Sequence, residues 1–193
     1  MSEGARRRTR MTQDERRRQL VGIGLRMLVE RPIQDLSVDE VATEAGISRG
    51  LLFHYFPTKT AFHDAVVSAA GRRVVRNTAP DEGLEPKEAL AQFVSRYYEQ
   101  IDRRRESYLA LVFGGGAVSL DGGRVEDLRV AMAERVAAIL VTDGDAWPVV
   151  HGWIAYVEAR ALRWSAEPRE ARDGIREETA HCVRALEALL SVR

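Results

Sequence analysis

The sequence predicts an all-α protein with a small N-terminal three-helix domain followed by a larger C-terminal helical domain. Apolar residues recur at three- and four-residue steps through most of the chain, and no segment shows the alternation of a β-strand. Serine or threonine precedes several of these segments, where its side chain can cap a helix. Glycine and proline separate the segments, as expected for helices joined by turns.

The first twenty residues are strongly basic, with seven arginines against three acidic residues, and residues 1–11 are predicted to form a flexible arm. Residues 1–76 carry 14 Lys and Arg and 9 Asp and Glu, whereas residues 77–193 carry 15 and 20, so their net charges are +5 and −5. This asymmetry favours contact with a polyanion at one end of the molecule. The arm itself is either a solvated tail or a contact to nucleic-acid phosphates or the minor groove.

The first predicted helix follows this arm. Thr12 and Glu15 have the spacing of a capping box, in which each side chain bonds the backbone N–H of the other residue. The helix is expected to run to about Arg31, because Pro32 disfavours its continuation. Its apolar side consists of Leu20, Ile23, Met27 and Leu28.

Residues 37–63 predict two short helices joined by a tight turn, with a third helix beginning just beyond them. Ser37 and Glu40 have capping-box spacing at the start of the first helix. Gly46 supplies the left-handed residue after this helix, and Ser48 caps the next one. A helix, a glycine turn and a second helix are typical of the helix-turn-helix, which places its second helix in a DNA major groove.

The second helix of this motif has one inward and one outward side. Leu52 and Phe56 lie four residues apart and are expected to pack inward. Pro57 ends the helix, and Thr58 caps a third helix predicted over residues 58–77. The outward side is free to contact DNA. It carries Arg49, Gly50, Leu51, Phe53 and His54.

In these residues the chain resembles the TetR family of transcriptional regulators. The resemblance rests on residues 37–42, 45–48 and 52–59, and it covers about a third of the chain, roughly residues 12–65. Phe53 departs from the family pattern, which usually has a tyrosine there, and it therefore lacks a hydroxyl that could bond a phosphate.

The resemblance implies a homodimer that binds an inverted-repeat operator in double-stranded DNA and is released by a small apolar or amphipathic effector. A dimer that binds DNA without any ligand, and an activator with the same fold, are alternatives. The expected domain organisation is a basic arm over residues 1–11, a helix-turn-helix domain over 12–57, a connecting helix over 58–77 and a ligand-binding and dimerisation domain over 78–193.

Physical chemistry gives the motif residues distinct roles. Ser37, Val38 and Thr58 stand at helix N-termini, whose free N–H groups bind phosphates. Arg49 can pair with guanine or with a phosphate, and Lys59 with a phosphate. The resemblance assigns bases to the outward side of the second helix and phosphates to Tyr55 and Lys59. The candidate DNA contacts are Ser37, Val38, Ser48, Arg49, Gly50, Leu51, Phe53, His54, Tyr55, Thr58 and Lys59.

The rest of the chain predicts further helices, separated by a loop near residues 77–85 and a glycine-rich connection at residues 114–123. Pro86 suits the first turn of a helix. The last two helices are long enough to build a four-helix bundle with a second copy of the chain, and the resemblance favours that dimer. The predicted helices cover residues 86–105, 108–113, 125–140, 148–164 and 168–192.

The resemblance places an effector pocket between helices of the C-terminal domain, where apolar and aromatic residues are candidates. The pocket candidates are Phe93, Tyr97, Tyr108, Val112, Phe113, Met132, Trp153 and Tyr156. The candidates for the dimer interface lie on the last two helices. They are Val157, Ala161, Trp164, Val183, Leu186 and Leu190.

The sequence also argues against several other classes of protein. Four histidines and one cysteine, Cys182, show no metal-ligand or nucleophile spacing, so we expect no enzyme, metal or cofactor. A lone cysteine allows no intrachain disulfide, and this thiol lies on an apolar stripe where an inert buried role is expected. No apolar run could span a bilayer and no signal peptide is present, so the expected location is the cytoplasm.

Overall fold

The computed structural model describes residues 11–29, 33–112, 123–141 and 144–192, and none of these residues forms a strand. The predicted all-α class is confirmed. In chain order the elements are α1 (Gln13–Met27), η1 (Ile33–Asp35), α2 (Val38–Glu44), α3 (Arg49–Tyr55), α4 (Lys59–Asn77), α5 (Pro86–Val112), α6 (Gly123–Leu140), η2 (Gly144–Ala146), α7 (Trp147–Ala166), η3 (Arg169–Ala171) and α8 (Ile175–Ser191).

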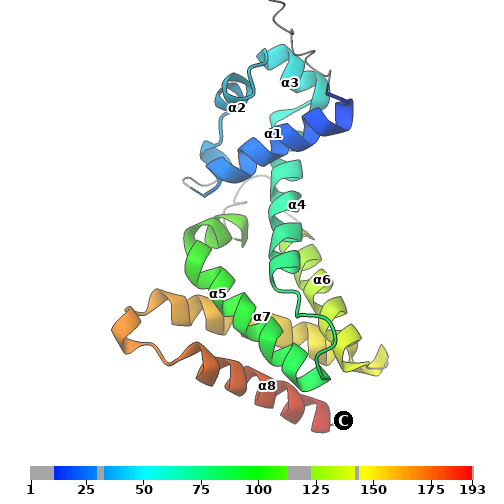
Figure 1. Ribbon diagram of the computed structural model, residues 1–193, viewed down its shortest axis with the longest axis vertical. Helices are drawn as coiled ribbons and strands as arrows, with labels where there is room; N and C mark the ends of the chain where they lie inside the picture. Colours follow the sequence, from blue (N-terminus) through cyan, green and yellow to red (C-terminus); the bar gives the residue numbers. More distant parts are fainter. Residues whose placement is uncertain (1–10, 30–32, 113–122, 142–143, 193) are drawn as a thin grey trace, which may run out of the picture.

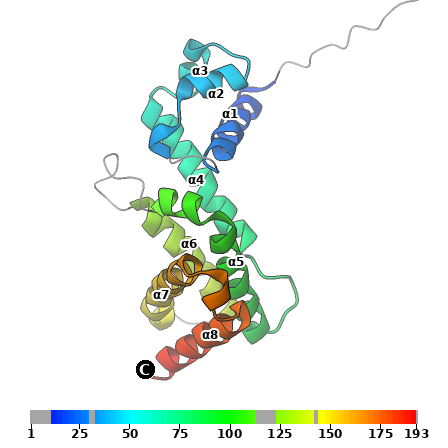
Figure 2. The ribbon, with the colours of Figure 1, turned by 90° about the vertical axis from the view of Figure 1, so that its left-hand side faces the viewer.

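The molecule is elongated, with a head formed by α1, α2 and α3 at one end (Figure 1). Helix α4 runs from the head into a body formed by α5 to α8, and the turned view shows the same two parts (Figure 2). Helix α8 and the C-terminal end of the chain lie at the end of the body farthest from the head. The helix-turn-helix is therefore presented at one end of the molecule.

Two hydrophobic cores lie along α4. Phe62, Val66 and Val67 in the first half of this helix belong to the core of the head. Val74, further along, belongs to the core of the body. One continuous helix is therefore packed into both cores.

Helices α1 and α4 pack closely at Gly24, where a Cβ atom would lie 2.6 Å from Cγ2 of Val66 and 3.1 Å from Cζ of Phe62. We expect Gly24→Ala to lower the free energy of unfolding by about 1–3 kcal/mol through overpacking. Gly22 on the same helix has no such neighbour within 4 Å, so Gly22→Ala should raise it by about 0.5–1 kcal/mol. Urea unfolding of both variants measures this, and an equal gain from both would contradict the close packing.

Helix α1 ends at Met27, four residues before the predicted end at about Arg31. Leu28 caps the helix with its side chain buried, and the N–H of Val29 bonds to the carbonyl of Arg26, three residues back. This tight bond closes the last turn. The prediction used Pro32, which lies outside the described residues. The helix instead ends at the local turn that the bond from Val29 to Arg26 closes.

Helix α8 begins at Ile175, not at residue 168 as predicted. The guanidinium of Arg172 donates to the carbonyls of Ser165 and Glu167, pairs with Asp102 of α5 and lies 4.8 Å from the ring centroid of Trp164. These contacts hold the segment between α7 and α8 in a non-helical path. The sequence does not reveal them because Asp102 is 70 residues away.

Helix α5 begins at Pro86, as predicted, and contains a kink at Arg104, where φ is −140° and ψ is 33°. The kink lies where two separate helical segments were predicted, ending near Arg105 and beginning near Tyr108. The predicted glycine-rich connection at residues 114–123 falls almost entirely outside the described residues.

The residues predicted for a dimer interface face the core of their own chain. Val157, Ala161, Trp164, Val183 and Leu186 are at most 8% exposed, and Leu190 packs partly buried against the same core. The apolar stripes of α7 and α8 pack onto α5 within the body. Their assignment to a dimer interface stays a prediction. The outward positions of the two helices include Gly152, Ala159, Arg163, His181, Arg184 and Leu189.

A buried polar network links α5, α6 and α7 in the body. The hydroxyl of Tyr97 lies 2.6 Å from that of Tyr108, which donates to Oε1 of Glu158 at 2.9 Å. Arg129 donates to Oε2 of Glu158 at 2.7 Å. Glu158 is 3% exposed, so Arg129 compensates a carboxylate that water hardly reaches.

A second network links α5, α7 and α8. The hydroxyl of Tyr98 donates to Oε2 of Glu178 at 2.8 Å and lies 3.6 Å from the sulfur of Cys182. Arg160 bonds both carboxylate oxygens of Glu178. Cys182 is fully buried, and burial raises the pKa of its thiol. The thiol is therefore shielded, in keeping with the inert role predicted for it.

The buried tyrosines predict a loss of stability in alkali. Burial raises the pKa of Tyr97, Tyr98 and Tyr108 well above the usual value of about 10. Above that pH the unfolded chain releases these protons and the folded chain keeps them, so the free energy of unfolding falls as pH rises, by about 1.4 kcal/mol per pH unit for each tyrosine. Urea unfolding between about pH 8 and 11 checks this. Tyr98→Phe should make the fall of the unfolding free energy with pH less steep, by the contribution of one proton. An unchanged slope in Tyr98→Phe would refute this assignment.

Candidate DNA-binding interface

The turn between α2 and α3 has the geometry that the sequence predicted. Gly46 adopts a φ of 65°, which is the left-handed conformation. The N–H of Gly46 bonds to the carbonyl of Thr43 at 3.0 Å, and the N–H of Ile47 to the carbonyl of Ala42 at 3.0 Å. These bonds end α2 as a compact turn. Leu52 and Phe56 are both fully buried beneath it, so the inward side of α3 is as predicted.

Three hydroxyl caps fix the helix N-termini. Ser48 accepts from the N–H of Leu51 at 3.2 Å, and Thr58 accepts from that of Ala61 at 2.9 Å. Ser37 also caps its helix, but its hydroxyl accepts from the N–H of Asp39 instead of that of Glu40. The predicted caps are confirmed, with this change of partner at α2. Val38 has a buried side chain, so only its backbone can serve a phosphate.

The outward side of α3 is exposed as predicted. Arg49, Gly50, Leu51 and His54 are exposed, and Leu51 is 39% exposed although it is apolar. The exposed caps and the cation of the next helix surround this surface. They are Ser48, Thr58 and Lys59. Phe53 and Tyr55 are half-buried, so each contributes both to the core of the head and to its surface.

The guanidinium of Arg49 is held by Asp39 of α2. Its Nη1 atom donates to both carboxylate oxygens, at 2.8 and 3.1 Å. The guanidinium carbon also lies 5.4 Å from the centroid of the Phe53 ring, within cation–π range. The ring of Phe53 therefore supports Arg49. The sequence analysis considered only the phosphate contact that Phe53 lacks without a hydroxyl, and did not predict this role. Asp39 was not predicted as a partner of Arg49, although it stands ten residues before Arg49 on the neighbouring helix.

The other cations of the motif have neutral partners. Nζ of Lys59 lies 3.5 Å from the carbonyl of Gln34, a distance at the weak end of hydrogen bonding. Nη1 of Arg17 donates to the carbonyl of Tyr55 at 2.5 Å, and its guanidinium lies 4.3 Å from the Phe56 ring centroid. Arg17 thereby joins α1 to the C-terminal end of α3, where a cation is favoured.

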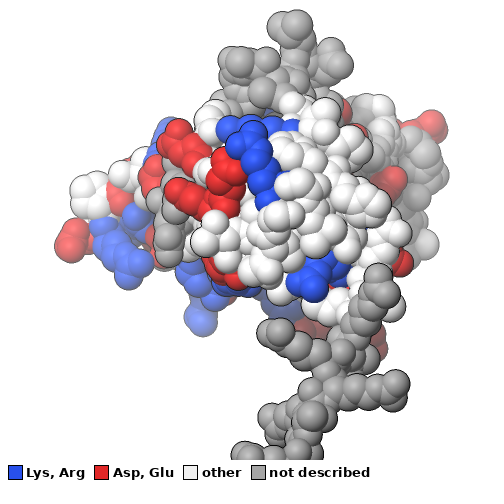
Figure 3. Space-filling view, turned by 90° about the horizontal axis from the view of Figure 1, so that it is seen from above, with Lys and Arg blue, Asp and Glu red and all other residues white. Residues whose placement is uncertain are grey.

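The end of the molecule that carries the motif is not uniformly basic. Seen from above, it shows Lys and Arg beside Asp and Glu, together with a broad area that has neither (Figure 3). Residues 1–10 carry four arginines and one glutamate, and so supply three of the five excess positive charges of residues 1–76. These ten residues lie outside the described part of the chain, and the proposed role of the arm stays a prediction.

The pocket residues predicted for the C-terminal domain separate into groups. Phe93, Tyr97, Met132 and Trp153 are at most 1% exposed and pack in the core of the body. Tyr156 lies elsewhere, because its hydroxyl is 2.5 Å from Nε2 of the exposed His181 on α8. Two cavities are lined by described residues, one between the head and the body and one beside α6, and none of these five residues lines either of them.

Tyr108 is the exception among the predicted pocket residues. It lines a cavity between the head and the body, together with residues of α1, α4 and α5 that the sequence did not indicate. The side chain of Val112 and the whole of Phe113 lie outside the described part of the structure, so their assignment stays a prediction.

Comparison with known proteins settles the family. A sequence model described as bacterial regulatory proteins of the tetR family matches residues 23–66, and one described as tetracyclin repressor-like, C-terminal domain matches residues 86–186. The protein belongs to the TetR family. It is a TetR-family transcriptional regulator with a DNA-binding helix-turn-helix, as its resemblance implied.

Solved structures of transcriptional regulators have the same fold. A TetR-family transcriptional regulator from Streptomyces coelicolor is 29% identical, with a TM-score of 0.74 over 94% of this chain and 83% of that one. A transcriptional regulator from Pseudomonas aeruginosa has a TM-score of 0.66 at 23% identity, over 95% and 94% of the two chains. The second likeness concerns the fold alone.

Curated regulators of the helix-turn-helix type match over shorter stretches. The transcriptional activator FasR of Mycolicibacterium smegmatis is 27% identical over 146 residues, which is 72% of this chain and 61% of FasR. The regulator EthR of Mycobacterium tuberculosis is 41% identical over 56 residues, which is 29% of this chain and 26% of EthR. The matched stretch thus spans about three fifths of FasR and about a quarter of EthR.

In the described part of this TetR-family chain, no helix is long and apolar enough to cross a membrane. No group of three or more His, Cys, Asp or Glu residues in that part is arranged to hold a metal ion.

Proposed function

We propose that this regulator is a ligand-responsive repressor that binds an inverted-repeat operator as a homodimer in the cytoplasm. The observation that carries the proposal is the exposed side of α3, which presents Arg49, Leu51 and His54 at the free end of the head. A helix of this kind, with its N-terminal residues exposed, fits the major groove. Repression then follows when the bound dimer occupies the DNA that transcription requires.

The contacts with DNA divide into those that read bases and those that position the protein. Arg49 reads guanine through its O6 and N7 atoms, and Leu51 packs against a thymine methyl group. Gly50 lets the backbone of α3 approach the base edges. The N-termini of α2 and α4 and the ammonium of Lys59 bind phosphates. Binding is therefore sequence-specific through α3 and salt-dependent through the phosphate contacts.

The dimer is proposed to form through the outward positions of α7 and α8. These helices lie at the far end of the body, so two heads can extend from a shared base toward one face of DNA. Half-sites about one helical turn apart, roughly 34–36 Å, would then each receive one α3.

We propose that α4 couples ligand binding in the body to the orientation of the head. This helix belongs to the core of the body at Val74 and to the core of the head at Phe62, Val66 and Val67. A ligand that alters the packing of α4 in the body changes the orientation of the head and so the spacing of the two α3 helices. By linkage, the ligand weakens DNA binding by the same factor by which DNA weakens ligand binding.

A second candidate function is transcriptional activation by the same contacts with DNA. It is favoured by one observation, the similarity to FasR, which is named an activator. The two functions differ in the effect of the bound dimer on a promoter. Transcription in vitro from a promoter that contains the selected operator separates them, since a repressor lowers the transcript and an activator raises it.

The test of the proposed function is selection of bound duplexes from a random pool, followed by sequencing. We expect an inverted repeat whose half-sites are separated by about one helical turn. Sedimentation of the protein with the selected duplex should show two chains per site. If no sequence is enriched, and the residual binding is weak and abolished by salt, specific operator binding is excluded.

A further inference from the structure

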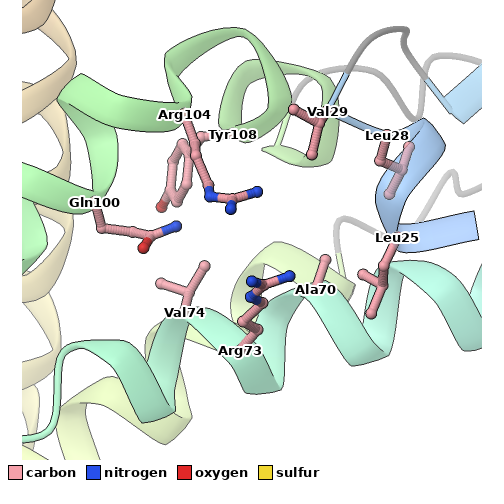
Figure 4. Close-up of a pocket in the computed structure, with 9 residues that line it drawn as sticks. All are labelled: Leu25, Leu28, Val29, Ala70, Arg73, Val74, Gln100, Arg104 and Tyr108. Atoms are coloured by element: carbon pink, nitrogen blue, oxygen red, sulfur yellow. The ribbon is translucent and has the colours of Figure 1, made fainter. Parts of the chain in front are cut away.

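A cavity of about 50 Å³ lies where the head meets the body, bounded by α1, α4 and the kinked part of α5 (Figure 4). Its apolar wall comes from both parts of the molecule. Leu25, Leu28 and Val29 belong to the end of α1 and the turn after it, and Ala70 and Val74 belong to α4. A molecule in this cavity would therefore contact the head and the body at once.

Two arginines face this cavity from different helices. Arg73 is on α4, and Arg104 is at the kink of α5. Figure 4 shows both guanidinium groups pointing into the space between the two helices. Two like charges are brought to one partly apolar site by residues that are 31 positions apart in the chain. Such an arrangement is unfavourable unless an anion joins it.

The described residues supply no such anion. None of the residues lining the cavity is acidic, and neither Arg73 nor Arg104 forms a hydrogen bond or ion pair within the described part of the chain. Arg129 and Arg160 of the body, in contrast, each pair with a buried carboxylate. The two cavity arginines thus differ from the arginines that stabilise the fold.

The remaining polar lining residues leave room for an anion. Gln100 is 5% exposed, and its carbonyl oxygen already accepts from the amide of Asn77 at 3.1 Å. Its amide nitrogen points toward the cavity in Figure 4 and can donate there. Tyr108 donates its hydroxyl proton to Glu158 and offers the cavity its ring. The polar groups available to a ligand are therefore donors.

We propose that this cavity binds a small carboxylate with an apolar body. The carboxylate would lie between Arg73 and Arg104, which can donate to its oxygens in charge-assisted hydrogen bonds. The apolar body would pack against Leu25, Leu28 and Val74. The volume is a few times the roughly 10–15 Å³ that one water requires, so the cavity holds the carboxylate and the adjoining part of the apolar body. The rest of a molecule such as benzoate would extend through the open side of the cavity.

The consequence of binding for DNA rests on the proposed function. A carboxylate between Arg73 and Arg104 draws α4 toward the kink of α5, while its apolar part touches the end of α1. The ligand thereby favours one orientation of the head relative to the body, and the affinity for the operator changes by the corresponding factor.

Calorimetric titration of the free protein with sodium benzoate tests the site without DNA. Benzyl alcohol and protonated benzylamine match benzoate closely in shape but are neutral and cationic. We expect measurable binding of benzoate, binding at least about tenfold weaker for benzyl alcohol, and no binding of benzylammonium. No heat from benzoate at millimolar concentrations, or equal binding of all three compounds, overturns the proposal.

Variants locate the site. Arg73→Gln and Arg104→Gln should each weaken benzoate at least about tenfold, because each removes one charged donor. Arg72→Gln is the matched control, since Arg72 is an exposed neighbour on α4 that does not line the cavity, and it should bind as the wild type does. Ala70→Leu fills the apolar end and should also weaken benzoate. Thermal unfolding of each variant confirms folding, and wild-type binding by folded Arg73→Gln and Arg104→Gln would overturn the assignment.

The same samples keep this proposal separate from the proposed function. If the protein selects an operator but does not bind benzoate, the proposed regulatory function stands and the proposed carboxylate site is refuted. If the protein binds benzoate through Arg73 and Arg104 but selects no operator, the carboxylate site stands and the proposed regulatory function is refuted.

Discussion

Arg49→Ala is expected to weaken binding to the selected operator by about 2–6 kcal/mol, because each bidentate arginine–guanine pair contributes about 1–3 kcal/mol and a symmetric dimer makes two. Preference for guanine at one position in each half-site should disappear at the same time. Competition binding with single-base operator variants measures both effects. A variant that loses affinity equally for all sequences would show that Arg49 contacts phosphate instead of a base.

The contact between Arg49 and Asp39 does not prevent this recognition. Their side chains are 60% and 57% exposed, and pairs of this kind contribute about 0–1 kcal/mol, so DNA can displace Asp39. Asp39→Asn removes a negative charge beside the phosphates, and we expect it to raise affinity for operator and unrelated DNA by similar factors. Lys59→Ala is the opposite control. It should weaken binding to all sequences alike and reduce the salt dependence by about one phosphate contact per half-site.

Arg129→Met is expected to lower the free energy of unfolding by about 3 kcal/mol, although methionine has a similar length and is apolar. The reason lies in Glu158, whose side chain is 4% exposed and would lose the guanidinium that pairs with it in the described part of the structure. Removing one member of a buried ion pair typically costs about 3–5 kcal/mol. We expect the lower end of that range, because Arg129 itself is 32% exposed. Urea denaturation of wild type and variant gives the value.

Two controls assign this loss to the buried charge. Adding Glu158→Gln to Arg129→Met should recover part of the stability, because the uncompensated carboxylate is then absent. Arg103→Met breaks an exposed pair with Glu99 one turn away on α5 and should change stability by less than about 0.5 kcal/mol. A loss for Arg103→Met equal to that for Arg129→Met would contradict the importance of burial.

The helix-turn-helix could be predicted from the sequence because its determinants are local. The caps at Ser48 and Thr58 act on N–H groups three residues away, and the left-handed turn depends on Gly46 alone. The inward side of α3 follows from the four-residue spacing of Leu52 and Phe56. Interactions within one turn of helix leave a direct pattern in the sequence.

Helix ends and the use of apolar stripes were predicted less well. The beginning of α8 was misplaced because Arg172 bonds to α5 and α7 and overrides the local signal at Pro168. Helix α1 ends four residues earlier than predicted, at a tight turn closed by the bond from Val29 to Arg26. The apolar stripes of α7 and α8 were correctly placed on helices. The sequence did not show that α5 of the same chain covers them. An amphipathic helix must bury its apolar side, and its sequence does not say whether its own chain or a second copy covers it.

By itself the sequence determined the all-α class, the helix-turn-helix and the family, because capping, helical spacing and turn chemistry act over a few residues. The tertiary structure alone decided that Asp39 holds Arg49, that Glu158 is paired with Arg129, and that Arg73 and Arg104 face one cavity. These contacts join different helices, the two arginines of the cavity being 31 residues apart and Arg129 and Glu158 29 apart. Such pairs are fixed by the packing of whole helices, which no local pattern of residues encodes.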